Sequence, residues 1–267
     1  MVGTVLNDGS ERVLPVPAAL RPWISQLSTA AVGEPVVPVR TEVPDTATAL
    51  VVRASGDRQE VVVMGPRTHA AYFEVSRVPF CVKARLRPGR ARALLGVPPR
   101  GLVDRAVPLD DLWGAAGDRL AEALSDVGPD AAAVVELLEK TLIGQVSALS
   151  GQDLARDELV HSATSALTAL AIPGPRRVRT TARRLNVSER HLRNLFTDAV
   201  GIPPKHFARI DRLRHVLTRA SQQSLTHLAV EAGYYDQSHM TAEFRRMMGV
   251  SPGAFITGQL PAATRCR

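Results

Sequence analysis

The chain has 267 residues, of which 45% are hydrophobic and 11 are aromatic, a size that fits one large domain or two ordinary ones. This apolar content supports a folded core and excludes wholesale disorder. The excess of positive charge is confined to the C-terminal third: residues 1–172 carry 17 basic and 20 acidic side chains, whereas residues 173–267 carry 16 and 6. Such a field is expected of a module that binds a polyanion.

The sequence contains neither a recognisable membrane span nor a secretory signal. No run of about 18 uncharged apolar residues occurs, and the start, MVGTVLNDGSERVLPVP, lacks a basic segment leading into an apolar stretch. Cys81 and Cys266 are far apart, without a CxxC motif or histidines at ligand spacing. We therefore expect a cytoplasmic protein with no membrane partner, disulfide, metal site or cofactor.

The first stretch, to about Pro108, is predicted to be rich in β-strands. Short valine-rich runs, ATALVVRAS, QEVVVMG and VPFCVKARL, are separated by Gly, Pro and Asp. In the third run the apolar residues Val82, Ala84 and Leu86 alternate with Lys83 and Arg85. This period of two predicts a strand with one face buried.

After Asp110 the pattern becomes helical. The segments are DDLWGAAGDRLAEALSDV and PDAAAVVELLEKTLIGQVSAL, and in the second Val134, Leu138 and Leu142 share a face. We expect this second segment to link domains or to pair two subunits. A further helix is predicted over about 153–171, ended by IPGPRR.

The basic C-terminal third contains an internal repeat. With an offset of 48 residues, SERHLRNLFTDAVGIPP aligns with DQSHMTAEFRRMMGVSP. Three aligned positions are identical: His191 with His239, Phe196 with Phe244, and Pro204 with Pro252. The repeat predicts two copies of one structural unit.

Each copy has the layout of a helix-turn-helix motif. A short apolar helix ends at Asn186 in the first copy and at Gly233 in the second, residues that tolerate the left-handed conformation of a sharp helix stop. Ser188 and Asp236 then provide the cap of the next helix. A helix, a tight turn and a capped helix are therefore predicted twice.

The second helix of each copy is predicted to present a polar face for reading DNA. In the first copy Leu192, Leu195, Phe196 and Ala199 point inward, and Arg190, Arg193, Asn194 and Thr197 point outward. In the second copy Met240, Phe244 and Met247 point inward, and Gln237, Ser238, Thr241, Ala242 and Arg245 lie on or beside the outer face. Arginine recognises guanine and asparagine recognises adenine in the major groove, so the first face is the stronger reader.

The segment between the copies, PKHFARIDRLRHVLTRA, is predicted to form a single helix of about 25 Å. Adding the radii of two small helical bundles places the reading helices about 34 Å apart, which is one turn of duplex DNA. We assign phosphate contacts to Thr197, Lys205, His239, Arg245 and Arg246. One chain would thus read two major-groove segments.

These residues resemble the DNA-binding domain of the AraC/XylS family of bacterial transcription regulators. The resemblance covers about 155–256 and is carried by AVEAGYYDQSHMTAEFRRMMGVSPGAF and LNVSERHLRNLFTDAVGIPP. It implies base contacts by Arg190, Arg193, Asn194, Gln237, Ser238, Thr241 and Ala242. Ala242 stands where the family usually has Arg, and Met240 where an aromatic is common, so the second motif is expected to add little selectivity.

The N-terminal half resembles, through MGPRTH, RLRPGRARALLGVPP and VPLDDLWG, an uncharacterised domain often found ahead of AraC-type motifs. The resemblance implies a sensor or dimerisation unit. A candidate ligand pocket comprises His69, Cys81, Lys83, Arg85 and Arg87, although an ordinary solvent-facing strand is the favoured interpretation.

The expected fold is α+β with a β-rich, cupin-like or partly open barrel domain over 1–127. A helical linker or dimerisation helix over 128–152 follows, then an all-α double helix-turn-helix domain over 153–257 and a flexible tail over 258–267. We expect a DNA-binding regulator, an activator associated with the nucleoid, that acts with RNA polymerase and responds to a small effector or to homodimerisation. The alternatives are an effector-independent regulator controlled by a protein partner and a cysteine-dependent DNA alkyl-transfer enzyme, and enzymatic activity is disfavoured.

Overall fold

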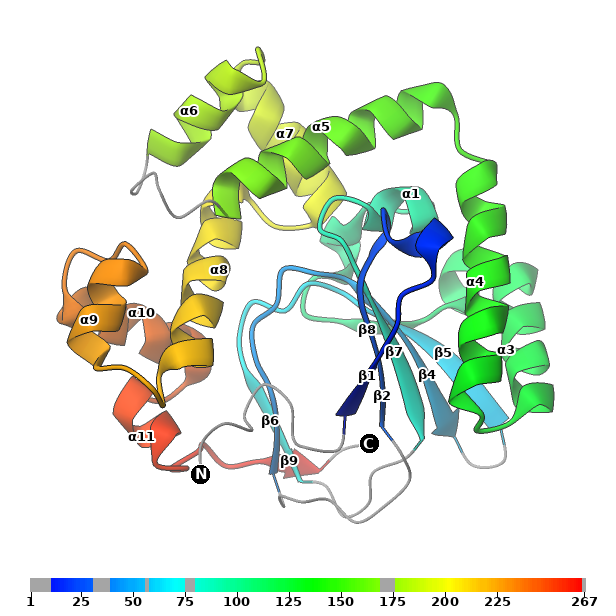
Figure 1. The fold of residues 1–267 in the computed structure, drawn as a ribbon, viewed down its shortest axis with the longest axis horizontal. Helices are drawn as coiled ribbons and strands as arrows, with labels where there is room; N and C mark the ends of the chain where they lie inside the picture. Colours follow the sequence, from blue (N-terminus) through cyan, green and yellow to red (C-terminus); the bar gives the residue numbers. More distant parts are fainter. Residues whose placement is uncertain (1–10, 31–38, 56–57, 75–79, 169–175, 266–267) are drawn as a thin grey trace.

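The computed structural model describes residues 11–30, 39–55, 58–74, 80–168 and 176–265. Strands dominate the first half of the chain and helices the second, as Figure 1 shows from blue to red. The predicted α+β class, with a β-rich region ahead of a helical one, is confirmed. Within these ranges no helix has both the length and the apolar character needed to cross a membrane.

The larger of two sheets contains six strands in the order β1-β2-β7-β4-β5-β8, and every neighbouring pair is antiparallel. The strands are β1 (Glu11–Leu14), β2 (Ile24–Ala30), β4 (Ala49–Ser55), β5 (Arg58–Met64), β7 (Cys81–Leu86) and β8 (Ala106–Pro108). Because β1 and β8 form its two edges, the sheet is open and does not close into a barrel among the described strands.

Strand β7 pairs with β2 and β4 in the middle of this sheet and shows the predicted alternation. Val82, Ala84 and Leu86 are fully buried, whereas Cys81, Lys83 and Arg85 between them are only half-buried. A strand whose alternate residues are apolar buries one face against the core and keeps the other face accessible. The valine-rich strands β4 and β5 pair over seven residues beside it.

Helices around the large sheet complete the N-terminal core (Figure 1). They are η1 (Ala18–Leu20), α1 (Ala91–Leu95), η2 (Pro99–Leu102), α2 (Asp110–Trp113), α3 (Ala115–Val127) and α4 (Ala131–Ser147). The apolar face predicted for α4, formed by Val134, Leu138 and Leu142, packs into this core. Helix α4 therefore covers its own domain, and this buried face is closed to a second subunit.

The C-terminal core is made by helices alone. They are α5 (Gly151–Thr168), α6 (Arg176–Arg184), α7 (Glu189–Val200), α8 (Pro204–Arg219), α9 (Leu225–Glu231), α10 (Gln237–Met248) and α11 (Pro252–Ile256). Val160, Ala163 and Leu167 of α5 belong to this core, so the chain passes from one core to the other between Ser147 and Gly151. The expected end of α5 near 171 and most of IPGPRR lie outside the described residues.

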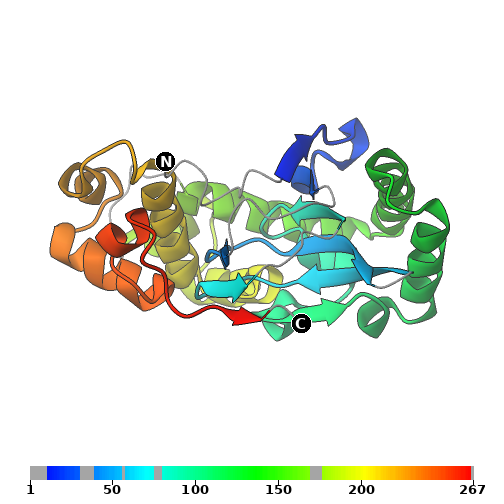
Figure 2. The same cartoon turned by 90° about the horizontal axis from the view of Figure 1, so that it is seen from below.

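The end of the chain differs from the expected flexible tail. Thr264–Arg265 forms β9, which pairs in parallel with β6 (Ala71–Glu74), and β6 pairs antiparallel with β3 (Val39–Glu42). The hydroxyl of Thr264 also donates to the carbonyl oxygen of Tyr72 at 3.3 Å. The free edge of β6 supplies the backbone partners that a two-residue strand cannot make alone. Figure 2 shows this red strand running out from the C-terminal helices to the lower edge of the N-terminal region.

Candidate nucleic-acid interface

Both predicted motifs have the local geometry of a helix, a sharp turn and a capped helix. Asn186 and Gly233 lie at the two turns with φ of 55° and 72°. The side chain of Ser188 accepts a hydrogen bond from the backbone N–H of His191 at 3.1 Å, and that of Asp236 accepts one from His239 at 2.7 Å. These caps satisfy backbone donors that have no partner within their helices, and fix where α7 and α10 begin.

Helix α7 separates its faces as predicted. Leu192, Phe196 and Ala199 are fully buried and Leu195 is half-buried. Arg190, Arg193 and Asn194 are exposed, and Thr197 is half-buried. The Arg193 guanidinium pairs with Glu189 one turn earlier, with 2.8 Å between Nη2 and Oε2. An exposed pair of this kind is weak and breaks easily in favour of a nucleobase or phosphate.

Helix α10 has the same division but a smaller polar face. Met240, Phe244 and Met247 are buried. Gln237, Ser238 and Ala242 are exposed, and Thr241 is half-buried. The hydroxyl of Thr226 on α9 donates to Oε1 of Gln237 at 2.7 Å. This contact orients the Gln237 amide from the neighbouring helix.

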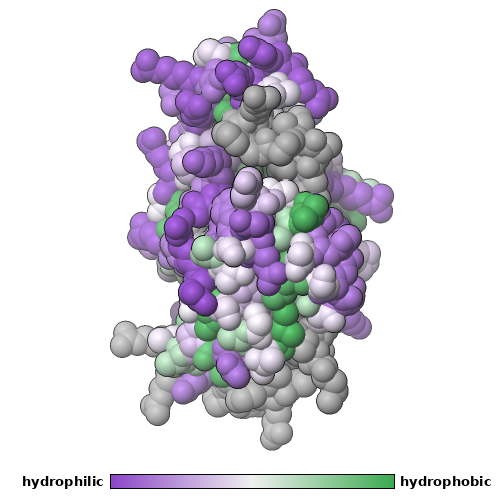
Figure 3. Space-filling view, turned by 90° about the vertical axis from the view of Figure 1, so that its left-hand side faces the viewer, coloured by the Kyte–Doolittle hydropathy of each residue, from purple (hydrophilic) through white to green (hydrophobic). Residues whose placement is uncertain are grey.

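Four of the five residues assigned to phosphate contact are exposed. Lys205, His239, Arg245 and Arg246 are exposed, and Thr197 is half-buried. The His239 ring packs edge-on against Tyr234, with 5.5 Å between ring centroids, which fixes its position beside the start of α10. Figure 3 shows hydrophilic residues covering much of the upper part of the face that the C-terminal helices form.

The connecting helix α8 is attached to α10 by a buried carboxylate that the sequence did not reveal. Glu243 is only 6% exposed, and its oxygens accept from Arg209 at 2.8 Å and Arg212 at 3.1 Å. Arg212 also stacks on Tyr234, 4.7 Å from the ring centroid. Paired side chains of this kind hold two helices in one relative orientation. Two of the arginines of α8 therefore point to Glu243 of the second motif.

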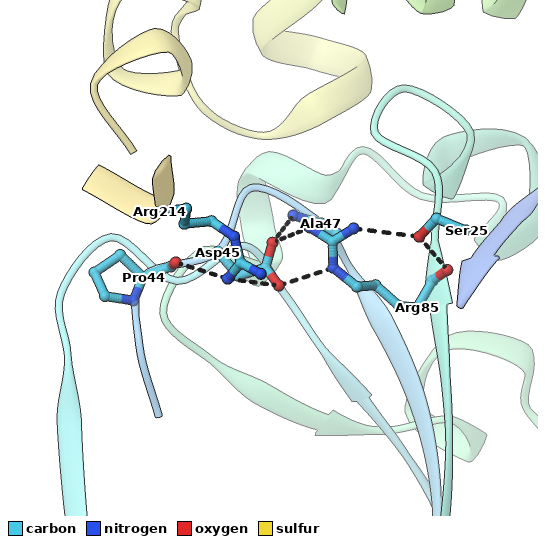
Figure 4. Close-up of polar contacts among 6 residues, drawn as sticks. All are labelled: Ser25, Pro44, Asp45, Ala47, Arg85 and Arg214. Atoms are coloured by element: carbon cyan, nitrogen blue, oxygen red, sulfur yellow. Dashed lines mark hydrogen bonds and ion pairs between the residues drawn. The ribbon is translucent and has the colours of Figure 1, made fainter. Parts of the chain in front are cut away.

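A second carboxylate, which is half-buried, joins α8 to the N-terminal domain (Figure 4). Asp45 accepts from Nε and Nη2 of Arg85 at 2.9 and 2.5 Å, and Nη1 of Arg214 on α8 lies 3.4 Å from Asp45 Oδ2. Burial alone would raise the pKa of Asp45, but the two guanidiniums outweigh it and lower the pKa to about 2. Arg214 also donates to the carbonyl oxygen of Pro44 at 3.2 Å.

The C-terminal ends of both reading helices contact the N-terminal domain. Asp198 on α7 pairs with Arg92 of α1 at 2.5 Å and with Arg156 of α5. At the end of α10 the backbone N–H of Ala70 donates to the carbonyl oxygen of Met247 at 2.7 Å. The adjacent Tyr72 hydroxyl donates to Met248 at 2.6 Å, and burial raises the pKa of Tyr72 to about 12. Each helix is thus held at the end opposite its cap.

Three residues of the candidate ligand pocket, Cys81, Lys83 and Arg85, alternate along β7 and are half-buried. Arg85 pairs with Asp45, and Arg87 Nε donates to the carbonyl oxygen of Arg21 at 2.7 Å. His69 is exposed and lies near His206 on α8. Burial raises the pKa of the Cys81 thiol despite nearby Arg40 and Lys83. Cys266 lies outside the described residues, and within the described part of the chain no three metal-ligating side chains gather.

Comparison with known proteins identifies the helical region. Residues 181–258 match a family model described as a helix-turn-helix domain. A search of curated proteins gave no match. The chain is similar to the solved C-terminal domain of AraT, a response regulator from Geobacillus stearothermophilus, at 19% identity over 43% of this chain and 91% of that chain, with a TM-score of 0.32.

Two further solved structures belong to ToxT from Vibrio cholerae. One is 10% identical over 86% of this chain and 98% of that chain, with a TM-score of 0.42. The other, with unsaturated fatty acid bound, is 12% identical over 84% and 88%, with a TM-score of 0.39. The family match covers the two capped motifs, so the sequence comparison and the structure agree on a helix-turn-helix domain in the C-terminal part of this chain.

Proposed function

We propose that this protein is a sequence-specific transcription regulator that reads two adjacent major-groove segments with α7 and α10. The observation that carries the proposal is the exposed polar face on each of the two helices. Both helices begin at a side-chain cap, bury one apolar face and end at a glycine in the left-handed conformation. Arg190, Arg193 and Asn194 supply the base contacts of the first segment, and Gln237, Ser238, Thr241 and Ala242 those of the second. The role of an activator that contacts RNA polymerase on the nucleoid belongs to the same proposal.

The N-terminal domain is proposed to set the DNA-competent arrangement of the two motifs. Support comes from the contacts of Asp45 with α8, of Asp198 with Arg92, and of Tyr72 with the end of α10. A small ligand or a second copy of the chain that favours one arrangement of these contacts shifts DNA affinity by its differential binding. Analytical ultracentrifugation with and without DNA tests the homodimer.

Control by a protein partner is the second candidate. A thermal-shift screen of metabolites distinguishes control by a small ligand from control by a protein partner. A ligand at 100 times its Kd stabilises its domain by about 2.7 kcal/mol, whereas a domain controlled by a protein partner gives no shift with any metabolite. A DNA alkyl-transfer enzyme would need a reactive thiolate. Burial raises the pKa of the Cys81 thiol, which disfavours that form at neutral pH.

Recovery of bound fragments from genomic DNA tests the proposed function directly. Purified protein should enrich fragments that share two motifs about one helical turn apart, and the genes beside them would indicate the regulated pathway. Binding must persist against scrambled competitor at a fixed salt concentration. Recovery of fragments without a shared motif would reject sequence-specific reading and leave only electrostatic binding.

A further inference from the structure

A surface cavity on the N-terminal domain lies between two of the segments on which the resemblance of this domain rests. One segment is RLRPGRARALLGVPP and the other is VPLDDLWG. The cavity has a volume of about 470 Å³, within the range of about 300–1,000 Å³ common for small-molecule sites. Its lining includes Val97, Leu102, Val107 and Leu112. These aliphatic side chains offer an apolar surface to a bound molecule.

Two guanidinium groups give this cavity a positive charge. Arg100 and Arg105 are both exposed and both line it, together with the carboxylate of Asp111. Neither arginine forms an ion pair with Asp111 or with another carboxylate of the described residues, and Arg105 donates only to the carbonyl oxygen of Gly101 at 3.1 Å. Their donors therefore remain available, and the three groups sum to a single positive charge. A monoanion balances that charge.

The wall that carries Arg100 is also the surface on which α7 rests. A Cβ atom added to Gly201, at the C-terminal end of α7, would lie 2.9 Å from the carbonyl oxygen of Pro99 in η2. On the other side, a Cβ atom at Gly65 would lie 1.8 Å from the carbonyl oxygen of Leu102. The η2 backbone is therefore packed closely between β5 and the first reading helix. A molecule that alters η2 changes the support of α7 directly.

We propose that this cavity binds a small organic monoanion with an apolar body, and that η2 transmits its presence to α7. The aliphatic lining binds the body, and Arg100 and Arg105 bind the carboxylate or sulfonate group. This inference rests on the proposed regulation through the N-terminal domain, and it places the effector at residues other than His69, Cys81, Lys83, Arg85 and Arg87. The site lies at the β8 edge of the large sheet, next to the first motif.

Titration of the full chain with paired probes tests the chemical class. The probes are octanoate, phenylpropionate and benzenesulfonate, each compared with its neutral amide by calorimetry and thermal shift. An anion at about ten times its Kd should raise Tm by about 3–6 °C with one site per chain. The matched amide should bind at least about tenfold more weakly. Absence of binding by all three anions, or equal binding of an amide, overturns the proposal.

Two kinds of variant locate the binding site. Arg100→Gln combined with Arg105→Gln should weaken anion binding by about 10–100-fold, with Arg58→Gln, an exposed arginine on β5, as the charge control. Gly101→Phe should fill the cavity without backbone strain, because a Cβ atom there meets nothing within 4 Å. Gly144→Phe, at an equally open position on α4, is its control. Unchanged anion affinity in the double arginine variant overturns the site, whether or not Gly101→Phe folds.

Amide hydrogen exchange of the wild-type chain tests the transmission step. An anion should slow exchange in residues 97–112 and at the end of α7, residues 197–202. Slowing confined to other segments contradicts the proposal. The same protein preparation is also tested for preferential binding to the DNA fragments recovered from the genome over scrambled competitor DNA. Preserved DNA preference without anion binding rejects this inference alone, whereas lost DNA preference rejects the proposed regulator itself.

Discussion

The two reading helices share a scaffold and differ on the face they expose. Both begin at a side-chain cap and both end at a glycine with positive φ, Gly201 and Gly249, whose N–H bonds a carbonyl 2.9 Å away. Phe196 and Phe244 are equivalent in the repeat and both are buried. The outer faces differ, however. That of α7 carries Arg190, Arg193 and Asn194, whereas that of α10 carries smaller side chains, which include Ser238 and Ala242. Cap and core fix the helix, and the outer residues are free to specify DNA.

A second difference lies in how each helix is fixed on its inner side. The repeat aligns Glu243 of α10 with Leu195 of α7. Leu195 packs among apolar neighbours, whereas Glu243 is held by Arg209 and Arg212 of α8. At this aligned position the first motif is thus fixed by apolar packing and the second by a buried charge network. The second should therefore be more sensitive to loss of a single side chain.

Glu243→Ala should have the largest effect, because it leaves two partly buried guanidiniums without their carboxylate. We expect a loss of about 3–5 kcal/mol in the free energy of unfolding, with fraying of α9 and α10. Leu195→Ala, the equivalent change in the first motif, should cost about 1–3 kcal/mol, since its side chain is only half-buried. Urea denaturation of both variants measures the difference. Equal losses would contradict the distinction between the two scaffolds.

Asp45→Asn should weaken the attachment of the N-terminal domain to α8. We expect a loss of about 2–3 kcal/mol in the free energy of unfolding. The folded pKa of Asp45, about 2, is below its unfolded value of 3.8, so its stabilisation is present above about pH 4 and is lost as the pH falls through about 2. Unfolding of the wild type and the variant between pH 5 and pH 2 should show the gap shrink by about 2 kcal/mol. Asp118→Asn, on the exposed face of α3, should show no such change.

Arg193→Ala should weaken binding to a recovered operator by about 1–3 kcal/mol, because it removes one bidentate base contact. Thr241→Ala should cost a few tenths of a kcal/mol, since α10 makes fewer specific bonds. Mobility-shift titrations at constant salt compare the two, with scrambled DNA as the control for nonspecific binding. Equal losses of operator affinity in the two variants would refute the prediction that α7 contributes more sequence selectivity than α10.

Tyr72→Phe should have a small effect on stability, since it removes one hydrogen bond to the end of α10 and leaves the packing intact. We expect a loss of about 0.5–1.5 kcal/mol in stability and a change in DNA affinity of less than tenfold. Thermal unfolding and operator titration measure the two quantities. A change in affinity without a change in stability would indicate that this bond acts on DNA binding alone.

The helix-turn-helix geometry follows from the sequence because its determinants are local. Caps such as Ser188, stops such as Asn186 and the apolar period of α7 act within a few residues. The contacts that fix the motifs relative to the rest of the molecule join residues far apart in sequence, such as Asp45 with Arg214, and no periodicity reveals them. Pairing of β9 with β6 is hidden for the same reason.

Operators with altered spacing test whether α8 holds the two reading helices at a fixed separation of about one turn of duplex DNA. Inserting about 5 or about 10 bp between the two recovered segments should lower affinity to that of the first segment alone. Full affinity with the 10-bp insertion would mean that the two motifs are joined flexibly. Unchanged affinity with both insertions would contradict reading by two motifs of one chain.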